Sequence, residues 1–270
     1  MLAWRTGLKA STVLAFVVSL LIQVGYPLGV TLYYRRRTHA RWQVFAYGAI
    51  IYAAFQLFTW LPLRAYIDVL VGSALTSELG AFIWLLASAL ATSLVEETGR
   101  WCGYRYLFPR GSFRLTWRNG VMFGLGHGAL ETVLLIAGLT FVNLLAYLIL
   151  SPMDLNALAR TMEVAASSGF VDALQEIAHT SWTQPLLVAM ERVLTLPHQV
   201  AWSLLVMESL AYRQRRWFIF AVLYHASVAV IVPGLARLSG LLVAEGVNVL
   251  LALVSLWIIL KLRAVSGAEG

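Results

Sequence analysis

Long apolar segments recur along the whole 270-residue chain and limit what it can fold into. A helix of about twenty residues, at about 1.5 Å per residue, crosses the hydrocarbon core of a bilayer. Hydrophobic residues make up 60% of the chain and charged residues only 12%, more apolar surface than a soluble core of this size would bury. The sequence therefore predicts an all-α, polytopic transmembrane helix bundle of about seven to eight spans.

Seven apolar segments are long enough to be interpreted as spans. They cover residues 11–34, 43–62, 79–104, 117–150, 184–212, 217–236 and 240–260. The fourth is unusually long, so we expect it to be strongly tilted or broken near Gly138. We interpret 1–270 as a single transmembrane domain. In it, 11–62 contains two N-terminal spans, 79–236 the core spans of the candidate site, and 240–263 the last span.

Residues 151–183 form the one substantial polar stretch, and its apolar residues recur at helical spacing. This pattern predicts an extracytoplasmic amphipathic connector, lying on the membrane or capping the site.

Basic residues cluster in alternate loops, after the first, third, fifth and seventh spans. The positive-inside rule then places the N-terminus outside and the C-terminus in the cytoplasm. We expect an integral protein of a bacterial or archaeal plasma membrane. The net charge of +7 is thus a topology signal, and no nucleic-acid partner is expected. The single cysteine, Cys102, excludes an intrachain disulfide and a multi-cysteine zinc site.

Ionisable residues are concentrated within the predicted spans, where they are costly unless they face a protein interior or a water-filled cavity. Glu96, Glu97 and Arg100 form a Glu-Glu-x-x-Arg motif near the end of the third span. His127 and Glu131 follow in a glycine-rich part of the fourth.

Further ionisable residues, Glu191, His198 and His225, lie in the fifth and sixth spans. Counted from the basic loops, Glu96, Glu97, His127 and His225 lie about 13 Å deep at ~1.5 Å per residue, and His198 somewhat deeper. We therefore expect the two glutamates and the three histidines to meet.

Helical spacing divides the expected roles of the two adjacent glutamates. Arg100 is three residues from Glu97 and four from Glu96, so we expect it to pair well with only one of them. The other carboxylate would remain free as a base, and the spacing does not decide which one that is. Glu131 shares a helix face with His127, and Glu191 shares one with His198, so both are expected to be supporting residues.

These motifs resemble the CAAX-protease and bacteriocin-processing superfamily of intramembrane proteases. The resemblance rests on Glu-Glu-x-x-Arg at 96–100, Phe-x-x-x-His at 123–127 and the histidines of two later spans. Gly-x-Gly-His-Gly-x-x-Glu at 124–131 is most similar to the YhfC-like membrane peptidases.

The resemblance implies glutamate-dependent hydrolysis of a peptide bond in a membrane-anchored or amphipathic substrate. Glu96 or Glu97 with His127 would activate a water, and His198 and His225 would stabilise the oxyanion. Better-studied relatives have asparagine four residues after the last histidine, whereas this chain has Ala229. His198 would then supply the missing donor.

Two alternatives remain open at this point. The histidines and glutamates are also zinc ligands, although no His-Glu-x-x-His motif is present, so we expect no metal and keep a zinc-dependent metalloprotease as the alternative. The second alternative is a non-proteolytic membrane protein of the same fold, acting in immunity, as a partner protein or as a proton-coupled transporter.

Overall fold

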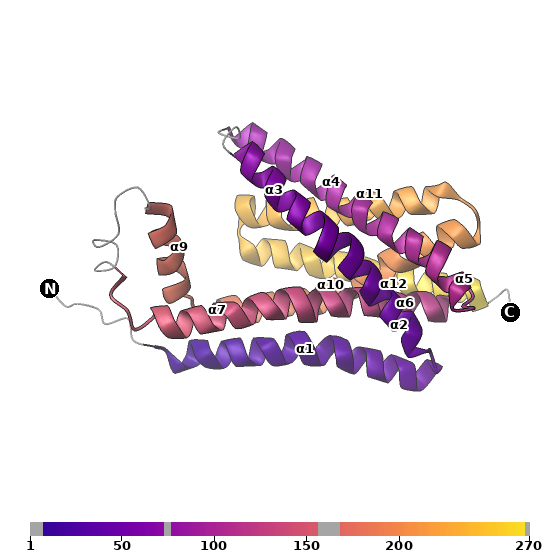
Figure 1. The fold of residues 1–270 in the computed structure, drawn as a ribbon, viewed down its shortest axis with the longest axis horizontal. Helices are drawn as coiled ribbons and strands as arrows, with labels where there is room; N and C mark the ends of the chain where they lie inside the picture. Colours follow the sequence, from indigo (N-terminus) through magenta and orange to yellow (C-terminus); the bar gives the residue numbers. More distant parts are fainter. Residues whose placement is uncertain (1–7, 73–76, 156–167, 268–270) are drawn as a thin grey trace. The chain divides into compact units, whose positions relative to one another are not determined.

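The computed structural model describes residues 8–72, 77–155 and 168–267, and this part of the chain is helical with no strand. Its first half contains α1 (Ala10–Thr38), α2 (Trp42–Tyr52), η1 (Ala53–Trp60), α3 (Leu61–Gly72), α4 (Glu78–Cys102), η2 (Gly103–Leu107) and α5 (Phe108–Arg110). The second half contains α6 (Trp117–Leu130), η3 (Glu131–Ile136), α7 (Ala137–Leu150), α9 (Ser168–Ala178), α10 (Thr183–Ala211), α11 (Arg215–Ser239) and α12 (Leu241–Gly267). Figure 1 shows the helices in sequence colours.

Three of the long helical rods contain a π-helical turn, namely η1, η2 and η3. A π-helical turn changes the direction in which the later side chains point about the helix axis. Such turns are frequent at functional sites. The fourth predicted span is not broken near Gly138. It continues from 117 to 150 through η3, which begins at Glu131.

Six helical rods in the described residues are long and apolar enough to cross a membrane. They correspond to six of the seven predicted spans, and the predicted helical membrane bundle is confirmed. The exception is α10, predicted as the fifth span. It is 29 residues long, but Glu191, Arg192 and Glu208 make it more polar than the others.

Local signals explain where the site-bearing helices begin. Ser77 precedes α4, and its side chain accepts a hydrogen bond from the backbone N–H of Gly80 at 3.0 Å. Thr116 precedes α6 and accepts one from the N–H of Asn119 at 3.4 Å. Both are capping contacts that satisfy backbone donors without an intrahelical partner.

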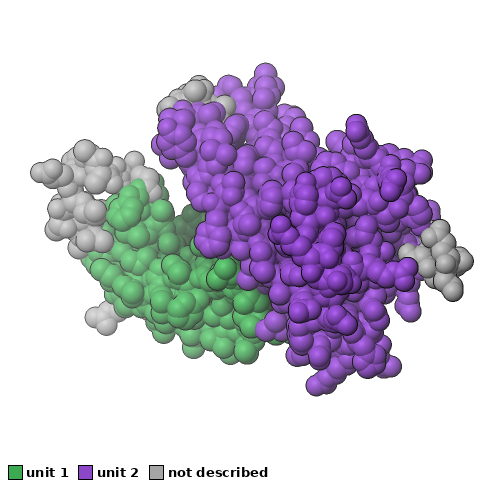
Figure 2. Space-filling view, turned by 45° about the vertical axis from the view of Figure 1, so that its right-hand side comes forward, with its two compact units in different colours: residues 1–26, 132–192 green, residues 27–131, 193–270 purple. Residues whose placement is uncertain are grey.

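Close contacts divide the chain into two compact units, coloured separately in Figure 2. Unit 1 comprises residues 1–26 and 132–192. Its core contains Phe16, Leu144 and Tyr147, and Ile177 of α9 packs against them. The helix predicted within 151–183 is therefore present as α9, with an apolar residue on this core, while residues 156–167 of the connector lie outside the described residues.

Unit 2 comprises residues 27–131 and 193–270, and contains α4, α6, α11 and α12. Within it, α2 packs on α6, and α11 packs on both α4 and α12. The contact of α2 with α6 depends on glycines. A Cβ at Gly48 would collide with the carbonyl oxygen of Phe123, and a Cβ at Gly126 with that of Phe45. Backbones can approach this closely only where both helices present small residues.

Candidate functional site

Arg100 contacts both adjacent glutamates, although the contact with Glu97 is much the closer of the two. Its Nη1 donates to Oε1 of Glu97, and its Nη2 lies 3.3 Å from Oε2 of Glu96. All three residues are buried in α4. The guanidinium has several N–H donors in a planar fork, so its two terminal nitrogens reach the i−3 and i−4 positions together.

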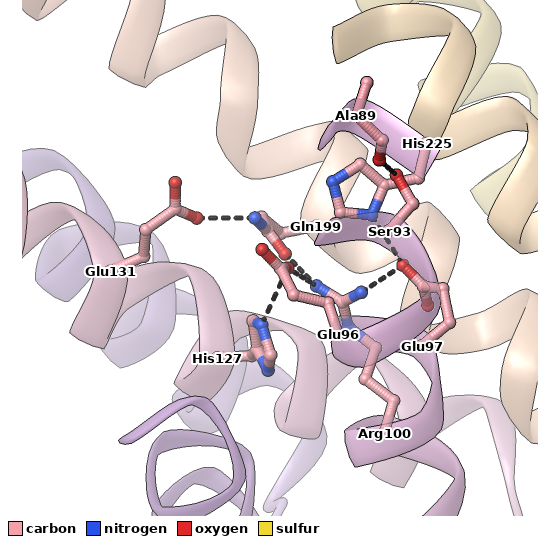
Figure 3. Close-up of polar contacts among 9 residues, drawn as sticks. All are labelled: Ala89, Ser93, Glu96, Glu97, Arg100, His127, Glu131, Gln199 and His225. Carbon is pink, nitrogen blue, oxygen red and sulfur yellow. Dashed lines mark hydrogen bonds and ion pairs between the residues drawn. The ribbon is translucent and has the colours of Figure 1, made fainter. Parts of the chain in front are cut away.

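Each glutamate also contacts a histidine from another helix (Figure 3). Nε2 of His127, on α6, lies 3.3 Å from Oε2 of Glu96. Nδ1 of His225, on α11, lies 2.8 Å from Oε1 of Glu97. The structure thus brings together the two glutamates and two of the three predicted histidines, around one arginine.

Gln199 of α10 joins this cluster, and sequence reasoning missed it. Its Oε1 accepts a hydrogen bond from Nη2 of Arg100, and its Nε2 donates to Oε2 of Glu131. Glu131 is therefore connected to the cluster through Gln199 (Figure 3). The signal that could have found it is a polar residue in a buried helix segment directly beside a candidate histidine.

His198 lies in the same unit, and its two ring nitrogens contact residues other than Glu96 and Glu97. Its Nδ1 is 2.7 Å from Oγ of Ser255, and its Nε2 is 3.4 Å from Oδ1 of Asn248. Both partners belong to α12. Consecutive helical residues point about 100° apart, so when Gln199 faces Arg100, His198 is turned toward α12.

Trp202 lies between the His198 network and the glutamate cluster. Its ring is stacked on His225 with a centroid separation of 3.8 Å and on His198 at 5.6 Å. The guanidinium carbon of Arg100 is 5.8 Å from the ring centroid of Trp202. The indole therefore fixes the plane of His225 from the side of α10.

Glu191, predicted to support His198, belongs to unit 1 and not to the unit that contains the cluster. Its Oε1 forms an ion pair with Nη2 of Arg192, and its side chain is 41% exposed. The seven residues that separate it from His198 on α10 correspond to about two helical turns.

The cluster contains more acidic groups than permanent cations. Glu96, Glu97 and Glu131 are acidic, and Arg100 is the cation that the first two share. Carboxylates and imidazoles are side chains that often act as general acids and bases. This gives the site the capacity for acid–base chemistry.

A zinc site needs at least three protein ligands at about 2.0–2.2 Å from the ion for histidine and carboxylate donors. The donor types are right, and Nδ1 of His127 and Oε2 of Glu97 are buried without a hydrogen-bond partner in the described part of the chain. However, no three His, Cys, Asp or Glu side chains within that part are grouped so that they could hold a metal ion. Arg100 occupies the position between the two carboxylates. As arranged here, these residues do not fit a three-ligand zinc site.

Comparison with known proteins shows what the sequence of this chain is similar to. The family model described as "YhfC intramembrane metalloprotease" matches residues 18–253. The curated protein "Uncharacterized membrane protein YhfC" of Bacillus subtilis (strain 168) is 28% identical over 237 residues, covering 85% of this chain and 86% of that protein. No solved structure matches the chain significantly. The family model covers most of the chain, and the chain belongs to the YhfC intramembrane metalloprotease family.

Proposed function

We propose that this protein is an intramembrane endopeptidase that hydrolyses a peptide bond in a membrane-anchored or amphipathic substrate by glutamate-type catalysis. The observation that carries the proposal is the pair of Glu–His contacts around Arg100, built from α4, α6 and α11. A carboxylate beside an imidazole can hold a water and accept its proton. The family description supports a peptidase, and the resemblance to the CAAX-protease superfamily supports the glutamate mechanism.

Of the two adjacent glutamates, Glu96 is the better candidate for the general base. Its side chain is 6% exposed, whereas that of Glu97 is fully enclosed. Its contacts with Arg100 and His127 are both 3.3 Å long, at the weak end of the hydrogen-bond range. A loosely held carboxylate that water can reach is better suited to proton transfer. Glu97, held by Arg100 and His225, then orients those two groups.

In the proposed reaction, Glu96 takes a proton from the water while the water oxygen attacks the carbonyl carbon of the substrate. The carbonyl becomes a tetrahedral oxyanion, which His225 and Arg100 stabilise electrostatically. The C–N bond then breaks, and the proton passes from Glu96 to the leaving nitrogen. One water is consumed, and the products are a carboxylic acid and an amine.

A cavity in the unit that contains the cluster offers a route for the peptide. It has a volume of about 340 Å³ and lies between α4, α10 and α11, where it is lined by Thr98, Trp101, Ser209, Arg215, Phe218 and Ile219. Trp101 is one helical turn from Glu97, and Phe218 is two turns from His225, so these residues share helix faces. The substrate would approach along these faces.

The test uses the full-length protein in vesicles of phosphatidylcholine and phosphatidylglycerol. The probe is a pool of quenched-fluorescence peptides, each anchored in the vesicle by a fatty acyl chain. We expect the wild-type protein to cleave and the Glu96→Gln variant to lose at least ~10²-fold in rate, as for removal of a general base. Glu191→Gln is the matched control and should keep the wild-type rate. Equal cleavage by the wild-type and Glu96→Gln proteins would contradict the proposal.

The zinc-dependent alternative has one observation in its favour, the word metalloprotease in the family description. Elemental analysis and chelator treatment of the same vesicles distinguish the two mechanisms. Glutamate-type catalysis predicts an unchanged rate after chelation. A rate that falls with chelation and returns with added zinc, together with about one zinc per chain, would establish the metalloprotease instead.

A further inference from the structure

The orientation of the Gln199 side chain is determined by its two neighbours. A guanidinium can only donate hydrogen bonds, so the amide atom facing Arg100 must be the oxygen. The atom facing the Glu131 carboxylate is the nitrogen, as its hydrogen bond requires. Gln199 is 2% exposed. The amide is therefore held in one orientation inside the cluster and cannot flip without losing both contacts.

A glycine provides the space for this side chain. A Cβ at Gly128, one residue after His127, would lie 3.0 Å from Cβ and 3.1 Å from Cγ of Gln199. Such distances are tighter than ordinary carbon contacts, so any larger residue at 128 would push Gln199 away from α6. The last glycine of the Gly-x-Gly-His-Gly motif thus sets the distance between Gln199 and the His127 backbone.

Gln199 also lies next to the proposed base. Nη2 of Arg100 contacts both Oε1 of Gln199 and Oε2 of Glu96, so a single nitrogen separates the amide from the carboxylate that would hold the water. An amide nitrogen carries two hydrogens. Glu131 accepts one of them, so the second is not needed for this contact.

We propose that Gln199 is a catalytic residue whose Nε2–H donates a hydrogen bond to the substrate carbonyl oxygen as it becomes an oxyanion. This assignment rests on the proposed peptidase function. Arg100 binds the amide oxygen and so increases the polarity of the N–H. Glu131 holds the amide in place, so that the donor is already oriented when the negative charge develops.

The experiment measures kcat and KM in the vesicle assay, with the anchored peptide that the wild-type protein cleaves fastest. Gln199→Leu removes the donor at similar size, and we expect kcat to fall ~10²–10³-fold with KM within about threefold, as for the loss of an oxyanion donor. Gly128→Ala displaces the amide without removing it, and a displacement of less than 1 Å should lower kcat by roughly tenfold.

Two matched controls separate catalysis from folding. Gln23→Leu replaces a buried glutamine whose Nε2 donates to Ser19 at 2.9 Å in unit 1, and Gly29→Ala adds a Cβ with nothing within 4 Å. Both should keep the wild-type kcat. Thermal unfolding reports the folded fraction of every variant, to which the rates are normalised.

The outcomes distinguish this inference from the proposed function. If Glu96→Gln abolishes cleavage but Gln199→Leu keeps the wild-type kcat per folded molecule, Gln199 is only structural and the inference is wrong. A rise in KM without a fall in kcat would also overturn it, because that pattern indicates substrate binding. If Glu96→Gln cleaves normally, or the wild-type protein cleaves no peptide, the proposed function and the inference fail together.

Discussion

The indole of Trp202 lies parallel to the imidazole of His225, with an angle of 9° between the rings and 3.8 Å between their centroids. The same indole is stacked on His198, whose ring nitrogens contact Ser255 and Asn248 of α12. The position of His225 beside Glu97 therefore depends on packing that reaches from α11 through α10 to α12.

Replacing Trp202 with leucine should lower both stability and activity. Trp202 is 3% exposed, and truncation of a buried tryptophan costs about 3–5 kcal/mol. With the stacking lost, His225 is no longer held in one plane, so we expect kcat per folded molecule to fall at least roughly tenfold. Trp202→Phe keeps an aromatic face and should retain most of the activity. Rates in vesicles and thermal unfolding in detergent check both expectations.

Replacing His198 with leucine should affect stability more than catalysis. The change leaves buried polar groups of α12 with fewer partners, at about 1–3 kcal/mol for each group left unsatisfied. Since the ring nitrogens of His198 contact Ser255 and Asn248, kcat per folded molecule should stay within about threefold of wild type. The oxyanion role that the sequence predicts for His198 leads to a different expectation for the His198→Leu variant. In that case, kcat would fall ~10²-fold in a protein that unfolds at the normal temperature.

Arg100→Lys should inactivate the protein although the charge is conserved. An ammonium group cannot reproduce the planar fork that reaches Glu96, Glu97 and Gln199 together. Breaking a buried ion pair costs about 3–5 kcal/mol when a charge is left without its partner. Arg64→Lys is the matched control, since Arg64 and Asp68 form an exposed pair at 3.6 Å and exposed pairs contribute about 0–1 kcal/mol. Thermal unfolding and cleavage rates of the two variants give the comparison.

Gly126→Ala should prevent the normal packing of α6 on α2. The added methyl group would collide with the backbone carbonyl of Phe45, and backbone cannot move aside as a flexible side chain can. We expect a loss of folded protein, measured by gel filtration in detergent and by thermal unfolding. Gly29→Ala has open space around its Cβ and, in a helix interior, should be neutral or stabilising by up to about 1 kcal/mol. Normal folding of Gly126→Ala would show that the two helices can separate without cost.

Much of the fold could be predicted from the sequence, because long apolar runs and basic loops act locally. The bounds of α1, α4 and α11 agree with the predicted spans to within a few residues. Glu191, Arg192 and Glu208 make α10 more polar than the six helical rods that could cross a membrane. Charged residues within a span are costly unless they face a protein interior or water. The orientation across the membrane and the wider superfamily remain predictions.

The candidate site could be predicted in part. Residue spacing identified Glu96, Glu97, Arg100, His127 and His225, because ionisable residues in apolar spans need partners at a similar depth. It could not determine the rotation of α10 about its own axis. A step of one residue turns a side chain by about 100°, so the sequence alone left His198 and Gln199 equally able to face Arg100.

Tertiary packing decided that rotation. Gly124 brings α6 against the backbone of Val200, and Gly128 provides the space in which Gln199 lies. With α10 fixed in this way, Gln199 contacts Arg100 and Glu131 while His198 contacts α12. The sequence by itself determined which residues must be buried with polar partners. Tertiary packing determined which partners these polar residues have. The close helix contacts at Gly124 and Gly128 join helices that are far apart in the chain.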